Sequence, residues 1–166
     1  MKDEHLRTRR LVYYTEDLDR VDKLLGEFLK LASAKSIYLV DKDGHLVTQK
    51  GHSQSINPET ISALVAGSFA ATKEMARVLG EAEFTVMFHQ GKKDHIHISL
   101  VSERAITAIV FDDQTTVGMV NLYSKELTAK LGKIFDVASK RAVQKEQIEE
   151  DYSDSVKERL DDMFKD

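Results

Sequence analysis

The chain contains no cysteine, only one proline (Pro58) and no long apolar run. Without cysteine there is no disulfide, no thiol catalysis and no cysteine-ligated zinc, which fits a reducing compartment. No apolar stretch approaches the roughly 18 residues of a membrane-spanning helix. The first ten residues are charged with no apolar core after them, so we expect no secretory signal. These absences favour a cytoplasmic location without a membrane span.

The common nucleotide-binding and hydrolase signatures are also missing. No G-x-x-x-x-G-K-[ST] segment occurs, so we do not expect the chain to bind GTP itself. No G-x-G-x-x-G or G-x-S-x-G segment occurs either, which removes the usual dinucleotide and serine-hydrolase signals. We therefore expect no cofactor and no active site of the chain's own.

What is present is the composition of one globular domain, with 42% hydrophobic and 31% charged residues in 166. The formal net charge of −4 is unevenly placed. Residues 144–166 hold nine acidic and four basic side chains, a net charge of −5, so the rest of the chain sums to +1. A neutral body with an acidic tail argues against a nucleic-acid partner.

The central feature of the sequence is a predicted helix between Asn57 and Gly80. Asn57 suits the N-cap, Pro58 suits the first helical position, and Gly80 suits the left-handed residue that follows a helix. Apolar and small residues recur there at helical spacing and predict the core face. This predicted face consists of Ile61, Leu64, Val65, Ser68, Thr72, Met75 and Leu79.

The other side of this helix carries small residues where a solvent-facing side normally carries charged ones. Its members are Ala63, Ala66, Gly67, Ala70 and then Glu74. A glycine in mid-helix costs about 1 kcal/mol relative to alanine, so Gly67 calls for a reason. Small residues allow another backbone to come close. Either a partner binds this side, or the small residues are tight internal packing.

The remaining pattern predicts two more helices and five strands. Helical periodicity marks residues 15–34 and 117–143, and β-type runs mark 36–41, 45–49, 84–90, 95–101 and 105–111. The order is αββαβββα. Because the strand pairs are joined by short turns such as Asp43-Gly44, we expect an α/β (α+β) fold with a mainly antiparallel five-stranded sheet and helices covering its faces.

We expect four segments along the chain. Residues 1–14 form an arm, either loose or an added strand; 15–143 form the domain; 144–155 are a polar, acidic linker; and 156–166 are a short amphipathic helix. The apolar stripe of this last helix consists of Val156, Leu160, Met163 and Phe164. So short a helix needs something to bind. That partner is either another protein or the chain's own domain.

Several segments together resemble a known family. They are VDKDG (Val40–Gly44), LVAGSFAATKEMARVLGE (Leu64–Glu81), FHQG (Phe88–Gly91), IVFDDQTTVGMVNL (Ile109–Leu122) and DDMF (Asp161–Phe164). Their order and spacing resemble the roadblock/dynein-light-chain family, and within it the bacterial MglB branch. The resemblance covers residues 36 to about 140 and extends to the tail.

The resemblance implies a homodimer in which the central helices lie side by side and the sheets join edge to edge. It also implies a partner, a small Ras-like GTPase of the MglA type, whose active site the dimer reshapes without an arginine finger. The tail would tune nucleotide exchange, and the process served would be cell polarity and motility. Mapped onto this chain, the GTPase-binding residues are Ala63, Gly67, Ala70, Ala71 and Glu74. Glu74 departs from a platform of small residues, which makes it a candidate partner for a basic residue of the GTPase.

Two other readings stay open beside this one. The chain could be a scaffold that binds a GTPase without affecting hydrolysis. It could also be a small enzyme or metal protein that uses His89, His95 and His97, which fall on adjacent strands. His95 and His97 share a strand face, but no further ligand is placed by the sequence, so we expect no metal and ordinary packed or solvated histidines.

Two arginines, Arg77 and Arg104, could be proposed as fingers that act on a partner's phosphates. Any exposed arginine could be proposed in this way, so neither is assigned.

Overall fold

The computed structural model describes residues 15–52 and 55–165. Its elements follow the predicted order αββαβββα. They are α2 (Thr15–Ala32), β1 (Ser36–Asp41), β2 (Leu46–Gly51), α3 (Pro58–Val78), β3 (Val86–Gln90), β4 (His95–Val101), β5 (Ala105–Phe111) and α4 (Val117–Met163). The predicted arm of residues 1–14 lies outside the described residues.

The five strands form one sheet in the order β2-β1-β5-β4-β3. Every neighbouring pair is antiparallel, which confirms the predicted sheet. Every residue of β5 is buried, as expected of its continuous apolar run. The short hairpins leave β2 and β3 at the two edges of the sheet.

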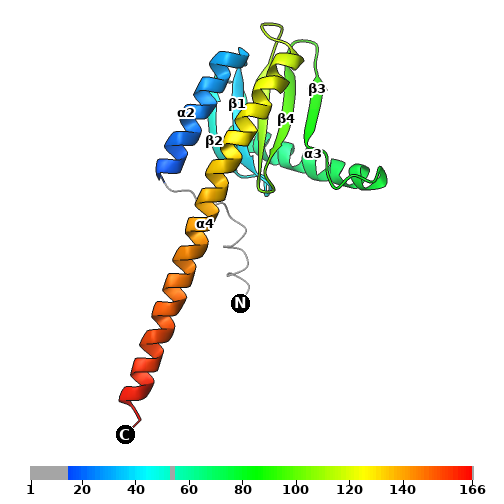
Figure 1. The fold of residues 1–166 in the computed structure, drawn as a ribbon. Coiled ribbons are helices and arrows are strands. Elements are labelled where there is room, and N and C mark those ends of the chain that lie inside the picture. Colours follow the sequence, from blue (N-terminus) through cyan, green and yellow to red (C-terminus); the bar gives the residue numbers. More distant parts are fainter. Residues whose placement is uncertain (1–14, 53–54, 166) are drawn as a thin grey trace.

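Helices cover both faces of the sheet, as predicted. Strand residues alternate between the two faces: Ile37 and Leu39 of β1 pack towards α2 and α4, while Tyr38 and Val40 pack towards α3. In Figure 1, α2 and α4 lie side by side on one face and α3 runs across the other. Each helix layer therefore has its own core cluster.

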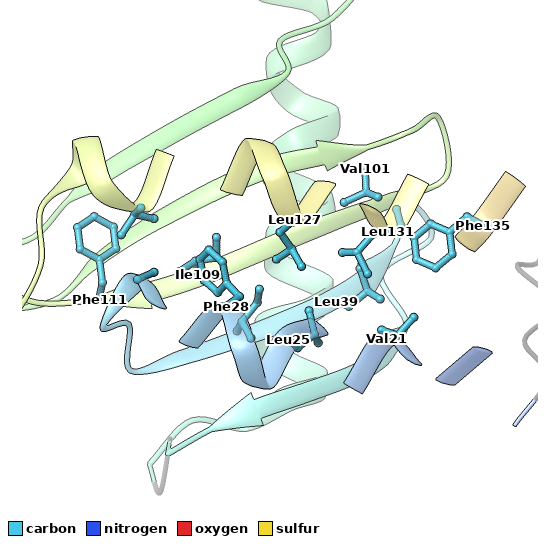
Figure 2. Close-up of a cluster of buried hydrophobic side chains, with 14 residues drawn as sticks. Val21, Leu25, Phe28, Leu39, Val101, Ile109, Phe111, Leu127, Leu131 and Phe135 are labelled. Atoms are coloured by element: carbon cyan, nitrogen blue, oxygen red, sulfur yellow. The ribbon is translucent and has the colours of Figure 1, made fainter. Parts of the chain in front are cut away.

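The larger cluster lies between the sheet and the α2–α4 pair. Figure 2 shows its side chains lying between the strands of the sheet and helices α2 and α4. The labelled members are Val21, Leu25 and Phe28 of α2, Leu39 of β1, Val101 of β4, Ile109 and Phe111 of β5, and Leu127, Leu131 and Phe135 of α4. This layer holds the N-terminal half of α4 against the body.

The C-terminal region is one continuous helix, which corrects the predicted linker over 144–155 and the separate helix over 156–166. Helix α4 runs unbroken from Val117 to Met163. The sequence after Gly132 contains no glycine or proline, and its many Glu, Lys, Arg and Gln residues are good helix formers. Extending a helix that is already packed needs no new nucleus, so a polar composition does not interrupt it.

The projecting half of α4 leaves the body altogether. Every residue from Val143 to Met163 is exposed, and Figure 1 shows this part running away from the sheet. The alternative in which the tail folds back on its own domain is therefore not what the structure shows. No helix in residues 15–52 and 55–165 is long and apolar enough to cross a membrane.

Candidate partner-binding face of α3

Helix α3 begins and ends at the residues that the sequence indicates. The side chain of Asn57 accepts a hydrogen bond from the backbone N–H of Thr60 at 3.0 Å, and Pro58 occupies the first turn. Gly80, just past the helix, has a φ of 81°, the left-handed conformation that glycine adopts without strain. These local signals fix where the helix begins and ends.

The residues that anchor α3 are not all those that were predicted. The buried ones are Ser62, Val65, Ala66, Phe69 and Ala76. Three of the five are small, which lets the helix lie close to the sheet. At the hairpin, a Cβ added to Gly44 would lie 3.3 Å from Ala63 Cα and 3.6 Å from Ala66 Cβ. For Ala66 and Ala76, internal packing is therefore the explanation.

The predicted core stripe is wrong at three positions. Leu64, Met75 and Leu79 are 64%, 60% and 71% exposed. Phe69, a large apolar residue left out of the predicted stripe, could have corrected it. When Val65 and Phe69 face the sheet, helical spacing turns Leu64 and Met75 outwards.

The five predicted GTPase-binding residues do lie together on the exposed side of α3. Ala63, Gly67, Ala70, Ala71 and Glu74 are all exposed. We call these five residues the outer face. Large apolar side chains that no described residue covers flank it: Leu64, Met75, Leu79 and Val78, the last 76% exposed. Burying such side chains stabilises a complex by about 1.5–3 kcal/mol each, so this side of α3 has the character of a contact surface.

Gly67 is not required by packing among the residues that the structure describes. A Cβ added there would have none of their atoms within 4 Å. Glycine in mid-helix lowers the stability of the helix relative to alanine, and contacts within one described chain do not explain why glycine occurs at position 67.

Glu74 is held by its own helix. Its carboxylate accepts hydrogen bonds from Nε of Arg77, at 2.9 Å, and from Nη2 of the same residue. These bonds lower the pKa of Glu74 below its usual value. Arg77, the arginine of α3, is therefore engaged in an ion pair at the end of the outer face.

Strand β3 borders this region, and no strand of the described ranges pairs with its outer edge. The backbone N–H of Leu100 donates to the carbonyl of Thr85 at 2.9 Å, which fixes the bonded pairs of the β3–β4 ladder. Because bonded and non-bonded pairs alternate in an antiparallel ladder, the backbone groups of Val86, Phe88 and Gln90 point away from β4. An unpaired edge of this kind is a template for another strand.

The apolar stripe predicted for the tail exists and is longer than expected. Val156 and Leu160 are 37% and 47% exposed, and Met163 and Phe164 are 76% and 83% exposed. On the continuous helix, Ile148 and Tyr152 precede them on the same side, at 68% and 72% exposed. We call Ile148, Tyr152, Val156, Leu160 and Met163 the tail stripe.

The three histidines do not form a site. His97 is buried, with Nε2 3.3 Å from Asn121 Oδ1 and Nδ1 3.2 Å from Ser99 Oγ. His95 lies on the same sheet face and contacts the ring of Phe111, at 5.2 Å between centroids. His89 pairs with Ile96 and so lies on the opposite face. The ring of His97 is a packed core group.

Arg104 is also engaged. Its guanidinium donates to Oγ of Ser139 on α4, on the sheet face opposite α3. It is therefore remote from the outer face.

One cluster that sequence reasoning missed lies in the β1–β2 hairpin. Over the described ranges, Asp41, Asp43 and His45 are the acidic and histidine side chains close enough to share a cation, with ligand atoms within 4.8 Å. Oδ1 of Asp41 accepts from the backbone N–H groups of Asp43 and His45, at 3.0 and 2.8 Å. These hydrogen bonds stabilise the turn, so the presence of Asp41 is explained by the structure of the hairpin.

Comparison with known proteins decides the family. The model of the Roadblock/LC7 domain matches residues 20–111, more than half of the chain. The chain belongs to the Roadblock/LC7 family. No curated protein matches the sequence.

Solved structures agree with this family assignment. The Roadblock/LC7 chain is 35% identical to Myxococcus xanthus MglB, with a TM-score of 0.72 over 77% of this chain and 96% of that one. It is 32% identical to the gliding protein MglB from Thermus thermophilus, with a TM-score of 0.71 over 76% and 96%. An MglB with a tetrameric arrangement is 31% identical, with a TM-score of 0.72 over 77% and 96%. The predicted roadblock fold and its likeness to MglB are confirmed.

Proposed function

We propose that this Roadblock/LC7 protein is a GTPase-activating regulator of a small Ras-like GTPase of the MglA type. It acts as a homodimer, and the outer faces of the two α3 helices form the platform for the GTPase. The observation that carries the proposal is the outer face itself. It is exposed, built of small residues around Gly67, and flanked by uncovered apolar side chains, on a chain that is 31–35% identical to MglB structures.

The mechanism needs no catalytic group from this chain. Phosphoryl transfer is governed by positioning and electrostatic stabilisation. A protein that binds one arrangement of the GTPase's own residues more tightly than the others therefore accelerates hydrolysis. As the resemblance implies, activation is proposed to proceed without an arginine finger; in the free chain Arg77 pairs with Glu74 on the exposed side of α3.

Homodimerisation is proposed on two further observations. The edge of β3 has unpaired backbone groups, and the exposed Met75, Val78 and Leu79 lie at the end of α3. Pairing β3 with its copy would extend the sheet and bring these side chains of two chains together. The apolar tail stripe, including Leu160 and Met163, is proposed as a second partner-binding surface that tunes nucleotide exchange. By the same likeness, the process served is bacterial polarity or motility, in the cytoplasm.

The test is multiple-turnover GTP hydrolysis by the MglA-type GTPase of the same organism, with increasing amounts of this protein. We expect a large rate increase that saturates near two chains per GTPase. Binding without any rate increase would favour the scaffold, and absence of both would refute the proposal.

A substitution localises the platform. Ala70→Arg places a long charged side chain where close approach is needed, so we expect GTPase binding and activation to be lost. Ala129→Arg, at an exposed position of α4, is the matched control and is expected to bind as the unmodified protein does. Circular dichroism and sedimentation establish that both variants are folded and report their oligomeric state. Unchanged activity of Ala70→Arg would show that the GTPase does not bind to the outer face of α3.

A further inference from the structure

The projecting half of α4 leaves the body just after its last contacts with the other elements. Ala138 is the last buried residue of α4, and every residue from Val143 to Met163 is exposed. In Figure 1, α2 begins at the level where α4 leaves the body. The residues that can hold the direction of the projecting half therefore lie between Ala138 and Val143.

One contact at this level joins α4 to α2. Nη2 of Arg141 donates to both carboxylate oxygens of Asp17, at 2.6 and 2.7 Å. The Asp17 side chain is only 3% exposed, whereas that of Arg141 is 39% exposed. Asp17 lies in the first turn of α2, where the helix dipole stabilises a negative charge. Because a buried carboxylate needs a partner, this ion pair holds Arg141 in place.

A second contact joins α4 to the turn between β4 and β5. The guanidinium of Arg104 donates to Oγ of Ser139. Ser139 and Arg141 are two positions apart, so their side chains point about 200° apart around a helix of 3.6 residues per turn. The two contacts therefore hold α4 from opposite sides. We call the Asp17–Arg141 and Arg104–Ser139 pairs the exit contacts.

Hydrogen bonds are suited to fixing the direction of a helix. Phe135 is the last residue of α4 in the larger core cluster. Apolar packing of that kind keeps α4 on the sheet, but the hydrophobic effect is non-directional. Hydrogen bonds, in contrast, have preferred distances and angles. Loss of an exit contact on one side would therefore let α4 tilt towards the other side.

We propose that the four residues of the exit contacts are positioning residues that fix the direction of the projecting half of α4. They thereby set where the tail stripe lies relative to the outer face of α3. They act through the helix and are not part of the tail stripe themselves. The use of the tail stripe in nucleotide exchange rests on the proposed function, whereas the direction of α4 is measured without the GTPase.

Distances between two spin labels measure this direction, and the absence of native cysteine allows labels at chosen positions. Nitroxides are attached at Gln49→Cys on β2 and at Ser153→Cys on the projecting half, both exposed positions. Labelled protein is diluted with an excess of unlabelled protein, so that a dimer carries labels on one chain only. With intact exit contacts we expect one narrow distance distribution.

Two alanine substitutions remove both exit contacts. Asp17→Ala with Ser139→Ala leaves no buried carboxylate unpaired, and we expect the narrow distribution to be replaced by a broad one. Asp19→Ala with Ser155→Ala makes the same substitutions on the same two helices at exposed positions, and should retain the narrow distribution. Circular dichroism establishes that both variants are folded.

Ser139→Ala alone keeps the proposal testable if Asp17→Ala prevents folding, since it removes only an exposed contact. We expect a shift of the mean distance, because α4 is then held from the side of α2 alone. An unchanged narrow distribution in Ser139→Ala and in the double variant would overturn the proposal. A broad distribution in the protein with intact exit contacts would also overturn it.

Nucleotide exchange separates positioning from a purely structural role. The double variant should lose the effect of the tail on exchange, as deletion of residues 146–166 does, and should keep the activation that depends on the outer face. An unchanged effect on exchange together with a broadened distance distribution would overturn the link between the exit contacts and the tail stripe. If the GTPase responds to no form of the protein, the proposed function fails and the distance result still stands.

Discussion

His97 is a titratable group inside the contact between β4 and α4. It is 1% exposed and shares a polar network with Asn121, Ser99 and Ser124, in which the two serine hydroxyls are 2.9 Å apart. Burial lowers the pKa of His97 below its usual value, although the hydrogen bond to Asn121 opposes the shift. The neutral ring is thus the form that the fold accommodates.

This shift predicts a pH dependence of stability. The unfolded chain takes up the proton at a higher pH than the folded chain does, so the free energy of unfolding falls as the pH drops below about 6.5. Urea unfolding at pH 7.5 and pH 5.5 measures the loss. His97→Gln should remove the part of the loss that this ring contributes, whereas His89→Gln, at an exposed position, should retain it. An equal loss in His97→Gln would assign the effect to other groups.

Gly67 allows a test of close approach that does not add bulk or charge. Gly67→Ala should raise the free energy of unfolding of the isolated protein by up to about 1 kcal/mol, because the added methyl meets nothing within 4 Å. If a partner backbone lies against this position, the same methyl weakens the complex. Gly26→Ala in α2, where a Cβ also meets nothing within 4 Å, should stabilise the protein without affecting binding. Equal binding by both variants would argue against close approach at Gly67.

Among the elements, α3 shows how far local pattern predicts structure. Its ends follow from Asn57, Pro58 and Gly80, whose preferences are local. Its phase on the sheet does not, because Ser62, Ala66 and Ala76 are buried by close approach to strands that are distant in sequence. The sequence left open whether the small residues of the other side are exposed or internally packed. The structure divides them, because Ala66 is buried whereas Ala63, Gly67 and Ala70 are exposed.

Helix α4 was mispredicted for a related reason. Residues 144–155 are mostly polar and acidic, a composition that favours a linker. An end needs a residue that stops propagation, and the sequence offers none before Met163. Composition therefore indicated solvent exposure correctly and the secondary structure wrongly.

The strand order β2-β1-β5-β4-β3 could not be predicted from the sequence, for a third reason. Hairpin signals identify pairs of strands that are neighbours in sequence, and they leave the pairing of β1 with β5 undetermined.

The exposure of the tail predicts the outcome of its removal. Deleting residues 146–166 takes away residues that are all exposed where they are described, so the thermal midpoint and the oligomeric state should be unchanged. We expect the affinity for the GTPase or its nucleotide exchange to change, as measured with a fluorescent nucleotide. Unfolding of the shortened protein would instead place the tail in the core.

At the scale of the whole molecule, the two open sheet edges offer a matched comparison. The backbone N–H of Val86 points out of the β3 edge, and that of Gln49 points out of the β2 edge, by the same alternation. Proline at either position removes one outward donor without removing a ladder bond.

In the proposed homodimer, the sheets join through β3. Val86→Pro should therefore give a folded monomer by sedimentation equilibrium, while Gln49→Pro remains a dimer. Monomers from Gln49→Pro alone would move the interface to the other edge. If both variants remain dimers, the dimer is held mainly by contacts between the two α3 helices and not by pairing of sheet edges.

The unbroken α4 also changes what its far end can do. A flexible linker over residues 144–155 would spread the last helix over a root-mean-square distance of about 17–21 Å and let it search for a partner. A helix instead holds Met163 about 33 Å beyond Arg141, since 22 residues rise about 1.5 Å each. The molecule then works as a ruler: a partner that contacts both the body and the tip must have sites separated by that span. For such a partner the effective concentration of the tip is high, and for a smaller one it is close to zero.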